Sequence, residues 1–127
     1  MSDRVRRALS RGHLIDITTT GRRSKQPRRV ELVFHNLAGR VYISGMPSRR
    51  RRSWLANLDA DPRFTFHLKG PVSADLPATA RIVREETERR EVLAQIARIW
   101  RRDDVDLMVR YSPLIEVLFP NDRPAMA

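Results

Sequence analysis

Residues 18–28 read Thr-Thr-Thr-Gly-Arg-Arg-Ser-Lys-Gln-Pro-Arg, a β-branched run that breaks into a basic turn and then resumes as a strand. Gly21 and Pro27 bracket the turn, so cationic side chains and backbone N–H groups gather at the end of a hairpin. Arginine presents a planar fork that pairs bidentately with phosphate or carboxylate. The stretch therefore predicts a hairpin whose end is a candidate anion site.

The chain around this hairpin predicts a meander of antiparallel strands with helices added later. Alternating residues predict strands over 13–19, 29–35, 40–44, 63–68, 78–83 and 114–119. Helices are predicted over residues 5–10, after a Ser53 cap, over 86–102, and from Asp103 or Asp104 to about Arg110. Because only turns separate the first three strands, a small barrel with helical covers is favoured over a parallel βαβ sheet.

The longest predicted helix, residues 86–102, is amphipathic. The side chains expected on its buried stripe are Val92, Leu93, Ile96, Ala97, Ile99 and Trp100. The chain of 127 residues falls in the one-domain range, and we expect a single domain over 1–127. Within it, residues 1–12 are expected to hold the N-terminal helix and residues 120–127 a loose tail.

Composition limits the chemistry that the chain can carry. The sequence has no cysteine, which excludes disulfides, thiolate nucleophiles and cysteine-ligated metals, so redox chemistry requires a bound cofactor. No run of about 18 apolar residues is present, and the start of the chain lacks the apolar segment of a secretory signal. We expect a cytoplasmic protein, or one that lies at most on a membrane surface.

A net charge of +10 favours anionic partners, which include nucleic acid, anionic lipid heads and a phosphorylated or carboxylated cofactor. Nearly all the cations are arginine, with lysine only at 25 and 69, and a GC-rich genome explains that bias equally well. The eight aromatic residues fall mostly at predicted core positions rather than among the arginines, so a nucleic-acid partner is not expected.

Most catalytic motifs are absent from the sequence. The three histidines, His13, His35 and His67, lack metal-ligand spacing, and no Walker loop, nucleophile elbow or G-x-G-x-x-G fingerprint occurs. Two basic clusters remain, at 22–29 and 49–52. A phosphate could lie between arginines and the N–H groups of the helix after Ser53, although 49–52 could equally be a solvated loop.

Two blocks of the sequence resemble the deazaflavin-dependent nitroreductase family. The first is the segment 18–28, and the second comprises Val-Tyr-Ile-Ser-Gly at 41–45, Ser-Trp-Leu-Ala-Asn-Leu at 53–58 and Asp-Pro at 61–62. The resemblance implies a mainly β fold with inserted helices, a split β-barrel like that of FMN-binding proteins. It also implies a homodimer with the cofactor near the subunit interface.

The implied coenzyme is the deazaflavin F420, with FMN as the alternative, and the implied reaction is hydride transfer to a quinone, a nitroarene or a similar small electron-poor acceptor. The cofactor-binding residues carried over by the resemblance are Arg22, Arg23, Ser24, Arg28, Ile43, Ser44, Gly45, Arg52 and Trp54. Tyr111, with Ser112, is the candidate group that supports or protonates the acceptor.

The sequence also departs from the family pattern. Glu31 stands where relatives often have proline, and the loop after Ser44 is shortened by about two residues in a by-eye alignment. These differences favour a side branch of the family, some members of which are associated with lipids or membranes. The alternative function is a non-catalytic binder of an anionic lipid or flavin-like ligand on the same barrel. The basic charge leaves peripheral contact with an anionic membrane open as a further partner.

Overall fold

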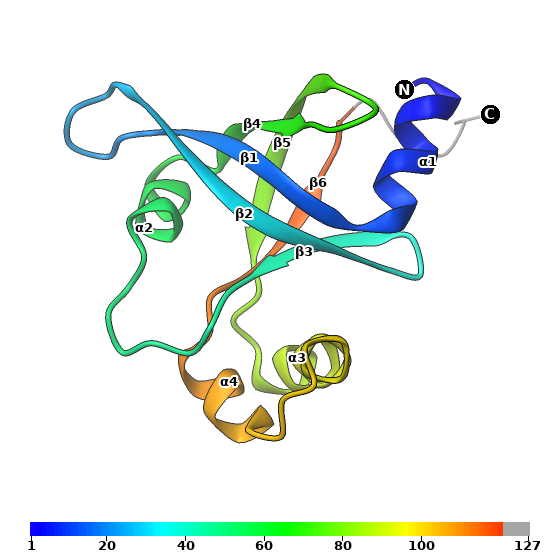
Figure 1. Cartoon of the computed structure of the whole chain (residues 1–127). Coiled ribbons are helices and arrows are strands. Elements are labelled where there is room, and N and C mark those ends of the chain that lie inside the picture. The colour runs from blue at the N-terminus through cyan, green and yellow to red at the C-terminus, as the bar shows by residue number, and fades with distance from the viewer. Residues whose placement is uncertain (121–127) are drawn as a thin grey trace.

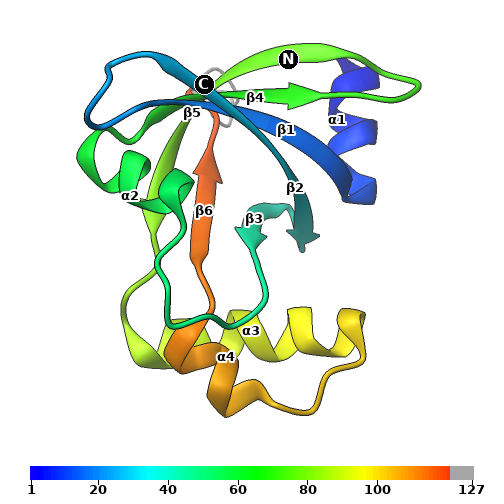
Figure 2. The same ribbon diagram turned by 60° about the vertical axis from the view of Figure 1, so that its left-hand side comes forward.

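Each described strand pairs with a neighbour on both sides, so six antiparallel strands close into a barrel in the order β1-β2-β3-β6-β5-β4 (Figures 1 and 2). This computed structural model describes residues 1–120. The strands are β1 (His13–Thr20), β2 (Pro27–Leu37), β3 (Arg40–Ser44), β4 (Arg63–Leu68), β5 (Ala74–Ile82) and β6 (Leu114–Leu118). Pairing of β1 with β4 completes the ring.

Four helices lie outside the ring of strands. They are α1 (Asp3–Arg11), α2 (Ser53–Ala60), α3 (Glu86–Trp100) and α4 (Val105–Tyr111). Figure 1 shows α1 and α2 at opposite ends of the long β1–β2 hairpin, with α3 and α4 together on the side of β3 and β6. None of these described helices is long and apolar enough to cross a bilayer.

The apolar side chains form two cores because β3 and β6 are covered on both faces. The barrel interior holds Ile15, Ile17, Phe34, Ile43, Phe66 and Ile115, joined by Val5 and Leu9 of α1 and Trp54 and Leu58 of α2. A second core lies between the outer face of the barrel and α3 with α4. It contains Tyr42, Val83, Val92, Leu93, Ile96, Ala97, Met108, Val109 and Leu114. Burial of these side chains provides most of the driving force for folding.

The structure confirms the predicted mainly β barrel with inserted helices and corrects several details. Ser53 is the first residue of α2 rather than its cap, and Arg52 occupies the cap position without a side-chain hydrogen bond. Ile99 is 57% exposed rather than buried, near the end of α3. That helix ends at Trp100, because Arg101 adopts a left-handed conformation with φ of 56°. The predicted tail beyond residue 120 lies outside the described residues.

Strand β5 begins four residues earlier than its sequence pattern predicts. Alternation is weak before Ala78, and Pro77 lacks the N–H that a central strand position needs. In the structure Pro77 lies opposite Thr65, and the pairing with β4 continues to Ala74 opposite Leu68. The neighbouring strand therefore extends β5 past its weakest segment.

A charged network on the outer face joins β3, β5 and β6 to α3. Glu116 of β6 is buried, and its two carboxylate oxygens accept hydrogen bonds from Arg40, at 2.8 and 2.9 Å, and from Arg81 at 3.0 Å. Arg81 also donates to Glu88 of α3. Burial alone would raise the pKa of Glu116, but the hydrogen bonds from the two arginines outweigh it and hold that pKa below its ordinary value.

We expect Glu116→Gln to lower the free energy of unfolding by about 2 kcal/mol at pH 7, because charge-assisted hydrogen bonds in a buried position are lost. A folded-state pKa below the unfolded value means that the carboxylate stabilises the fold above about pH 4.3, and this stabilisation is lost as the pH falls through the folded pKa. The difference between the two proteins should therefore narrow in acid.

Urea unfolding at pH 7 and in steps down to about pH 3 measures this difference, the range being set by the ordinary glutamate pKa. Glu91→Gln is the control, since Glu91 is exposed on α3 and should change stability by less than about 0.5 kcal/mol. Equal stability of wild type and Glu116→Gln at pH 7, or a difference that stays constant into acid, would contradict the network's role.

Candidate functional site

The basic turn between β1 and β2 has a fixed shape. The N–H of Gly21 donates to the carbonyl of Gln26 at 2.8 Å, and the N–H of Lys25 donates to the carbonyl of Gly21 at 2.9 Å. The hydroxyl of Ser24 accepts from the N–H of Gln26 at 3.2 Å. A Cβ added at Gly21 would lie 2.4 Å from the Ser24 hydroxyl oxygen, so glycine is the residue that lets the turn close this tightly.

Asn57 of α2 attaches this turn to the helix. Its side-chain oxygen accepts from the N–H of Arg22 at 3.1 Å and from the Arg22 guanidinium at 2.9 Å, while its NH₂ donates to the Thr19 hydroxyl at 3.1 Å. Asn57 is 3% exposed and its bond to Thr19 is buried, while the two bonds from the exposed Arg22 are partly buried. The position of the basic turn relative to α2 is therefore set by one buried amide.

A cleft of about 410 Å³, which we call the turn cleft, opens between the turn and α2. Its lining residues include Arg22, Arg23, Ser24, Arg28, Ser53, Trp54 and Asn57. Arg29, also on its wall, is paired with Asp16 at 2.9 Å. Within the described part of the chain, Arg23 and Arg28 have no such carboxylate partner, and no acidic side chain lines the turn cleft.

The start of α2 adds backbone donors to the same cleft. Because Arg52 provides no side-chain cap, the first N–H groups of the helix receive no side-chain acceptor, and they carry the positive end of the helix dipole. Ser53 and Trp54 place this helix end on the cleft wall, although Trp54 is only 7% exposed and packs mainly in the barrel core. The donor set of two unpaired arginines, one hydroxyl and helix amides fits a phosphate or carboxylate.

The second basic cluster lines a different cleft, of about 420 Å³, on the other side of the start of α2. We call it the loop cleft, after the loop 45–52. Its lining residues include Arg49 to Arg52, Leu55, Asp59, Arg84, Arg89, Arg110, Tyr111 and Ser112. The Tyr111 ring lies under the Arg49 guanidinium carbon, 5.5 Å from the ring centroid. The structure thus brings Tyr111 and Ser112 together with Arg52, and separates all three from Arg23 and Arg28.

Gly45 and Arg52 make contacts within the loop itself. The guanidinium of Arg52 donates to the carbonyl of Met46 at 2.6 Å, and burial lowers its pKa. A Cβ added at Gly45 would lie 3.1 Å from the Arg52 Nη2 and 3.2 Å from the Pro113 Cγ. Arg52 therefore braces the loop from within, and glycine at position 45 lets the backbone pass close to Arg52 and Pro113.

The resemblance assigns Ile43 and Ser44 to the cofactor, and the structure buries both side chains, on opposite faces of β3. Ile43 is fully buried in the barrel core, and the Ser44 hydroxyl donates to the carbonyl of Pro113 at 2.6 Å. Both faces of β3 are covered, one by the barrel interior and one by α3, so neighbouring residues are buried alike. Neither Ile43 nor Ser44 lines the turn cleft or the loop cleft.

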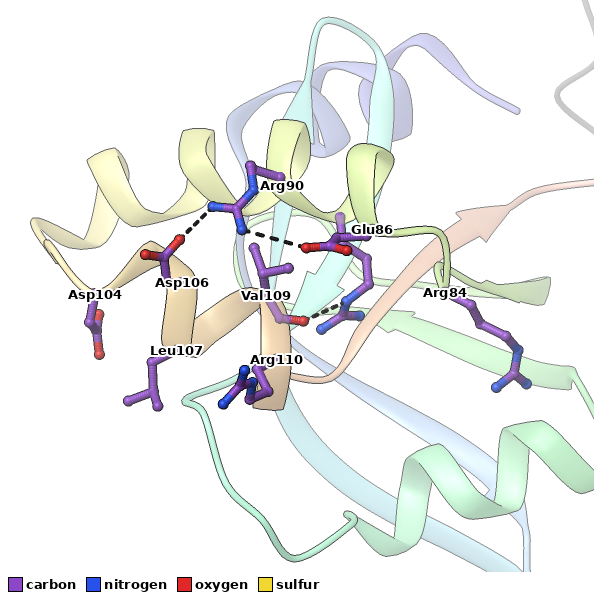
Figure 3. Close-up of a pocket in the computed structure, with 9 residues that line it drawn as sticks. Arg84, Glu86, Arg90, Asp104, Asp106, Leu107, Val109 and Arg110 are labelled. Atoms are coloured by element: carbon purple, nitrogen blue, oxygen red, sulfur yellow. Dashed lines mark hydrogen bonds and ion pairs between the residues drawn. The ribbon is translucent and has the colours of Figure 1, made fainter.

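A third cleft, of about 1020 Å³ and so larger than the turn cleft and the loop cleft, lies between α3 and α4 (Figure 3). Its central cation is compensated, since Arg90 pairs with Asp106 at 2.6 Å and with Glu86 at 3.8 Å. Figure 3 shows Arg84 and Arg110 pointing away from these ion pairs. Both arginines also line the loop cleft, so their positive charges add to those of Arg49 to Arg52 there.

Sequence reasoning missed two kinds of residue in these clefts. Asn57 was visible as part of the Trp-x-x-Asn-Leu block, but its hydrogen bonds to Arg22 and Thr19 depend on how α2 packs on the hairpin. Arg89 and Arg110 had no sequence signal, because helices α3 and α4 bring them to the loop 45–52 from more than thirty residues away.

The family described as F420H(2)-dependent quinone reductase matches residues 2–111. The fold is similar to a conserved hypothetical protein from Mycobacterium tuberculosis, with a TM-score of 0.74 and 17% identity over 100% of this chain and 91% of that chain. It is similar also to the F420-H2 dependent reductase FDR-A, with a TM-score of 0.59 and 22% identity over 82% and 92% of the two chains. None of the curated proteins matches the chain.

A further similar structure is that of an FAD-binding protein from Mesorhizobium loti, with a TM-score of 0.61 and 14% identity over 94% of this chain and 90% of that chain. At these identities the structures bear on the fold alone, and they confirm the predicted split β-barrel. The family match confirms the predicted enzyme class and the coenzyme F420. The predicted dimer and the assigned site residues stay predictions.

We expect Asn57→Ala to loosen the basic turn, because the Arg22 amide and the Thr19 hydroxyl lose their buried partner. The loss should lower the free energy of unfolding by about 2 kcal/mol and speed hydrogen exchange of the Arg22 amide. Gln95→Ala on the exposed face of α3 is the control, with a change under about 0.5 kcal/mol. Unchanged exchange at Arg22 in the Asn57 variant would show that the turn is held in another way.

Proposed function

The chain belongs to the F420H(2)-dependent quinone reductase family. From that membership we propose that one of its two basic clefts binds the coenzyme of a deazaflavin-dependent oxidoreductase and the other binds the acceptor. In this proposal the turn cleft holds the anionic tail of F420, and the loop cleft faces the acceptor, a quinone or a similar electron-poor compound. The observation that carries the proposal is the pair of unpaired arginines, Arg23 and Arg28, beside the uncapped start of α2.

The residues of the turn cleft would bind and orient the coenzyme. Arg23 and Arg28 supply bidentate donors to its phosphate and carboxylates, and the first N–H groups of α2 complete the shell. Ser24 can donate its hydroxyl proton while it still accepts from the N–H of Gln26. The Arg22 guanidinium is hydrogen-bonded to Asn57, so in this proposal Arg22 fixes the turn rather than binding the coenzyme. When bound, the reduced coenzyme supplies the hydride, which the chain itself has no group to provide.

The residues of the loop cleft would act on the acceptor. Tyr111 is half-buried at the end of α4, and its phenol can donate a hydrogen bond, and then a proton, to an acceptor oxygen that gains negative charge. Arg49 over its ring keeps that region positive and favours the charged form of a reduced acceptor. Ser112 offers a second hydroxyl close by in the chain. Neither FMN nor a nitroarene is needed to account for this arrangement.

Two further partners are part of the proposal. The resemblance to split-barrel oxidoreductases supports a homodimer. A cytoplasmic protein that touches an anionic membrane surface is supported by the net charge of +10 and by the exposed apolar side chains of Met46, Ile99 and Leu107, next to basic residues of the loop, α3 and α4. Contact with a membrane would bring the loop cleft close to lipid-soluble quinones.

We expect Arg23→Ala and Arg28→Ala each to weaken F420 binding at least about fivefold, which corresponds to about 1 kcal/mol for a lost charge-assisted hydrogen bond. Fluorescence titration of the oxidised coenzyme at moderate salt measures the Kd. Lys25→Ala is the matched control, because it removes one positive charge from the same turn without changing a residue of the turn cleft.

Unchanged affinity in both arginine variants would refute the assignment of the coenzyme tail to the turn cleft. A loss in Lys25→Ala as large as in the arginine variants would also contradict it, because the effect would then come from the overall charge of the turn rather than from contacts in the cleft.

A further inference from the structure

The loop cleft has far more positive charge than its own carboxylates can balance. Seven arginines line it, namely Arg49, Arg50, Arg51, Arg52, Arg84, Arg89 and Arg110, and Asp59 is the one acidic residue among the described residues of its wall. Like charges gathered in one concave site repel each other and lower stability unless an anion is present. The imbalance is therefore a cost that a bound anion would remove.

Asp59 is already paired with two of these arginines. One of its carboxylate oxygens accepts from Arg51 at 2.7 Å and the other accepts from Arg84 at 2.7 Å, and the hydrogen bond from Arg51 is the main cause that lowers the pKa of Asp59. In the described part of the chain no carboxylate pairs with Arg49, Arg50 or Arg110. These three guanidinium groups remain available to a ligand at the mouth of the cleft.

Arg89 puts a fixed cation at the inner wall of the cleft. Its guanidinium donates to four backbone carbonyls, those of Val83 and Val109 at 2.9 Å, of Met108 at 3.3 Å and of Ser112 at 2.6 Å. Burial lowers its pKa, yet a guanidinium stays charged at every physiological pH. Its partners are neutral, so its positive charge is held rigidly beside the cleft without a counter-ion.

The hydroxyl of Ser112 is a second feature that points to ligand binding in the loop cleft. Ser112 is 4% exposed, lines the loop cleft, and its side-chain oxygen has no hydrogen-bond partner among the described residues. A buried hydroxyl without a partner costs free energy unless something else binds it. A ligand oxygen that entered the cleft beside Arg89 would satisfy it.

We propose that the loop cleft is an acceptor subsite that selects electron-poor acceptors, such as quinones, that carry a carboxylate. Arg110 and Arg49 bind the carboxylate, Arg89 supplies long-range positive charge, and the Ser112 hydroxyl donates to an oxygen of the acceptor. The proposal rests on the proposed function, in which the coenzyme tail occupies the turn cleft. The two clefts share no lining residue, so both ligands can be held at once.

The coenzyme is a second source of carboxylates for the loop cleft, because the F420 tail itself carries them. Position favours the acceptor: Tyr111, the residue assigned to the acceptor oxygen, lies in the loop cleft in contact with Arg49. The unpaired arginines of the turn cleft already provide donors for the tail. The affinity of the Arg110→Gln variant for F420 separates the two sources.

The test compares a naphthoquinone carboxylate with its methyl ester, which has the same ring without the charge. Binding of each to the protein without coenzyme is measured by calorimetry, and the KM of each is measured with reduced F420. Wild type should bind the carboxylate at least about tenfold more tightly than the ester, as expected for charged hydrogen bonds. Arg110→Gln should remove most of that preference and leave binding of the ester and the Kd of F420 within about twofold. Arg49→Gln should, separately, weaken binding of the carboxylate in the protein without coenzyme.

Arg7→Gln is the matched control and should preserve the preference, since it removes one charge from an exposed position of α1. That helix lies away from α2, α4 and the loop that joins β3 to α2 (Figure 1). Equal binding of carboxylate and ester to wild type would overturn the proposal. A weaker F420 affinity in Arg110→Gln would overturn it too, and would assign the cleft to the coenzyme tail. Selective carboxylate binding in a protein that fails to bind F420 would instead overturn the proposed function and keep the anion subsite.

Discussion

The buried side chain of Asn57 determines how the basic turn and α2 lie together, and the turn cleft exists because of it. The amide joins Arg22 and Thr19 of the hairpin to the helix, while the tight closure at Gly21 gives the turn one shape. With the turn held in place, Arg23 and Arg28 face the start of α2 and not open solvent alone. Without it, the same arginines would be long, mobile side chains on an exposed hairpin, with little capacity to orient a coenzyme.

The distribution of carboxylates explains why only some of the many arginines are available to ligands. Asp16 pairs with Arg29, Asp59 with Arg51 and Arg84, and Glu116 with Arg40 and Arg81. These ion pairs stabilise the barrel and its helices. Each of the two clefts on either side of the α2 start keeps arginines that no carboxylate of the described residues pairs with. Part of the net charge of +10 is therefore left unbalanced in these two clefts, and each cleft fits an anionic group.

The strands and the turn could be predicted from the sequence because alternation and the Gly21 and Pro27 punctuation are local signals. The burial of both faces of β3 could not be predicted, since it depends on α3 packing over Tyr42 and on the segment before β6, which accepts the hydrogen bond of Ser44. The sequence also could not predict that the two basic clusters lie in separate clefts. It depends on the side of α2 along which the loop 45–52 runs, which is set by contacts with the segment before β6.

The central claim is that this barrel binds a deazaflavin and uses it to reduce an acceptor, and equilibrium titration of the purified protein with oxidised F420 and, separately, with FMN tests it most directly. The account predicts saturable, micromolar binding of F420, weakened by salt because charged groups hold its tail, and much weaker binding of FMN, which lacks the carboxylated tail. Binding of FMN alone would keep the fold and contradict the coenzyme assignment. Binding of neither would contradict the oxidoreductase account and favour the non-catalytic binder of an anionic lipid.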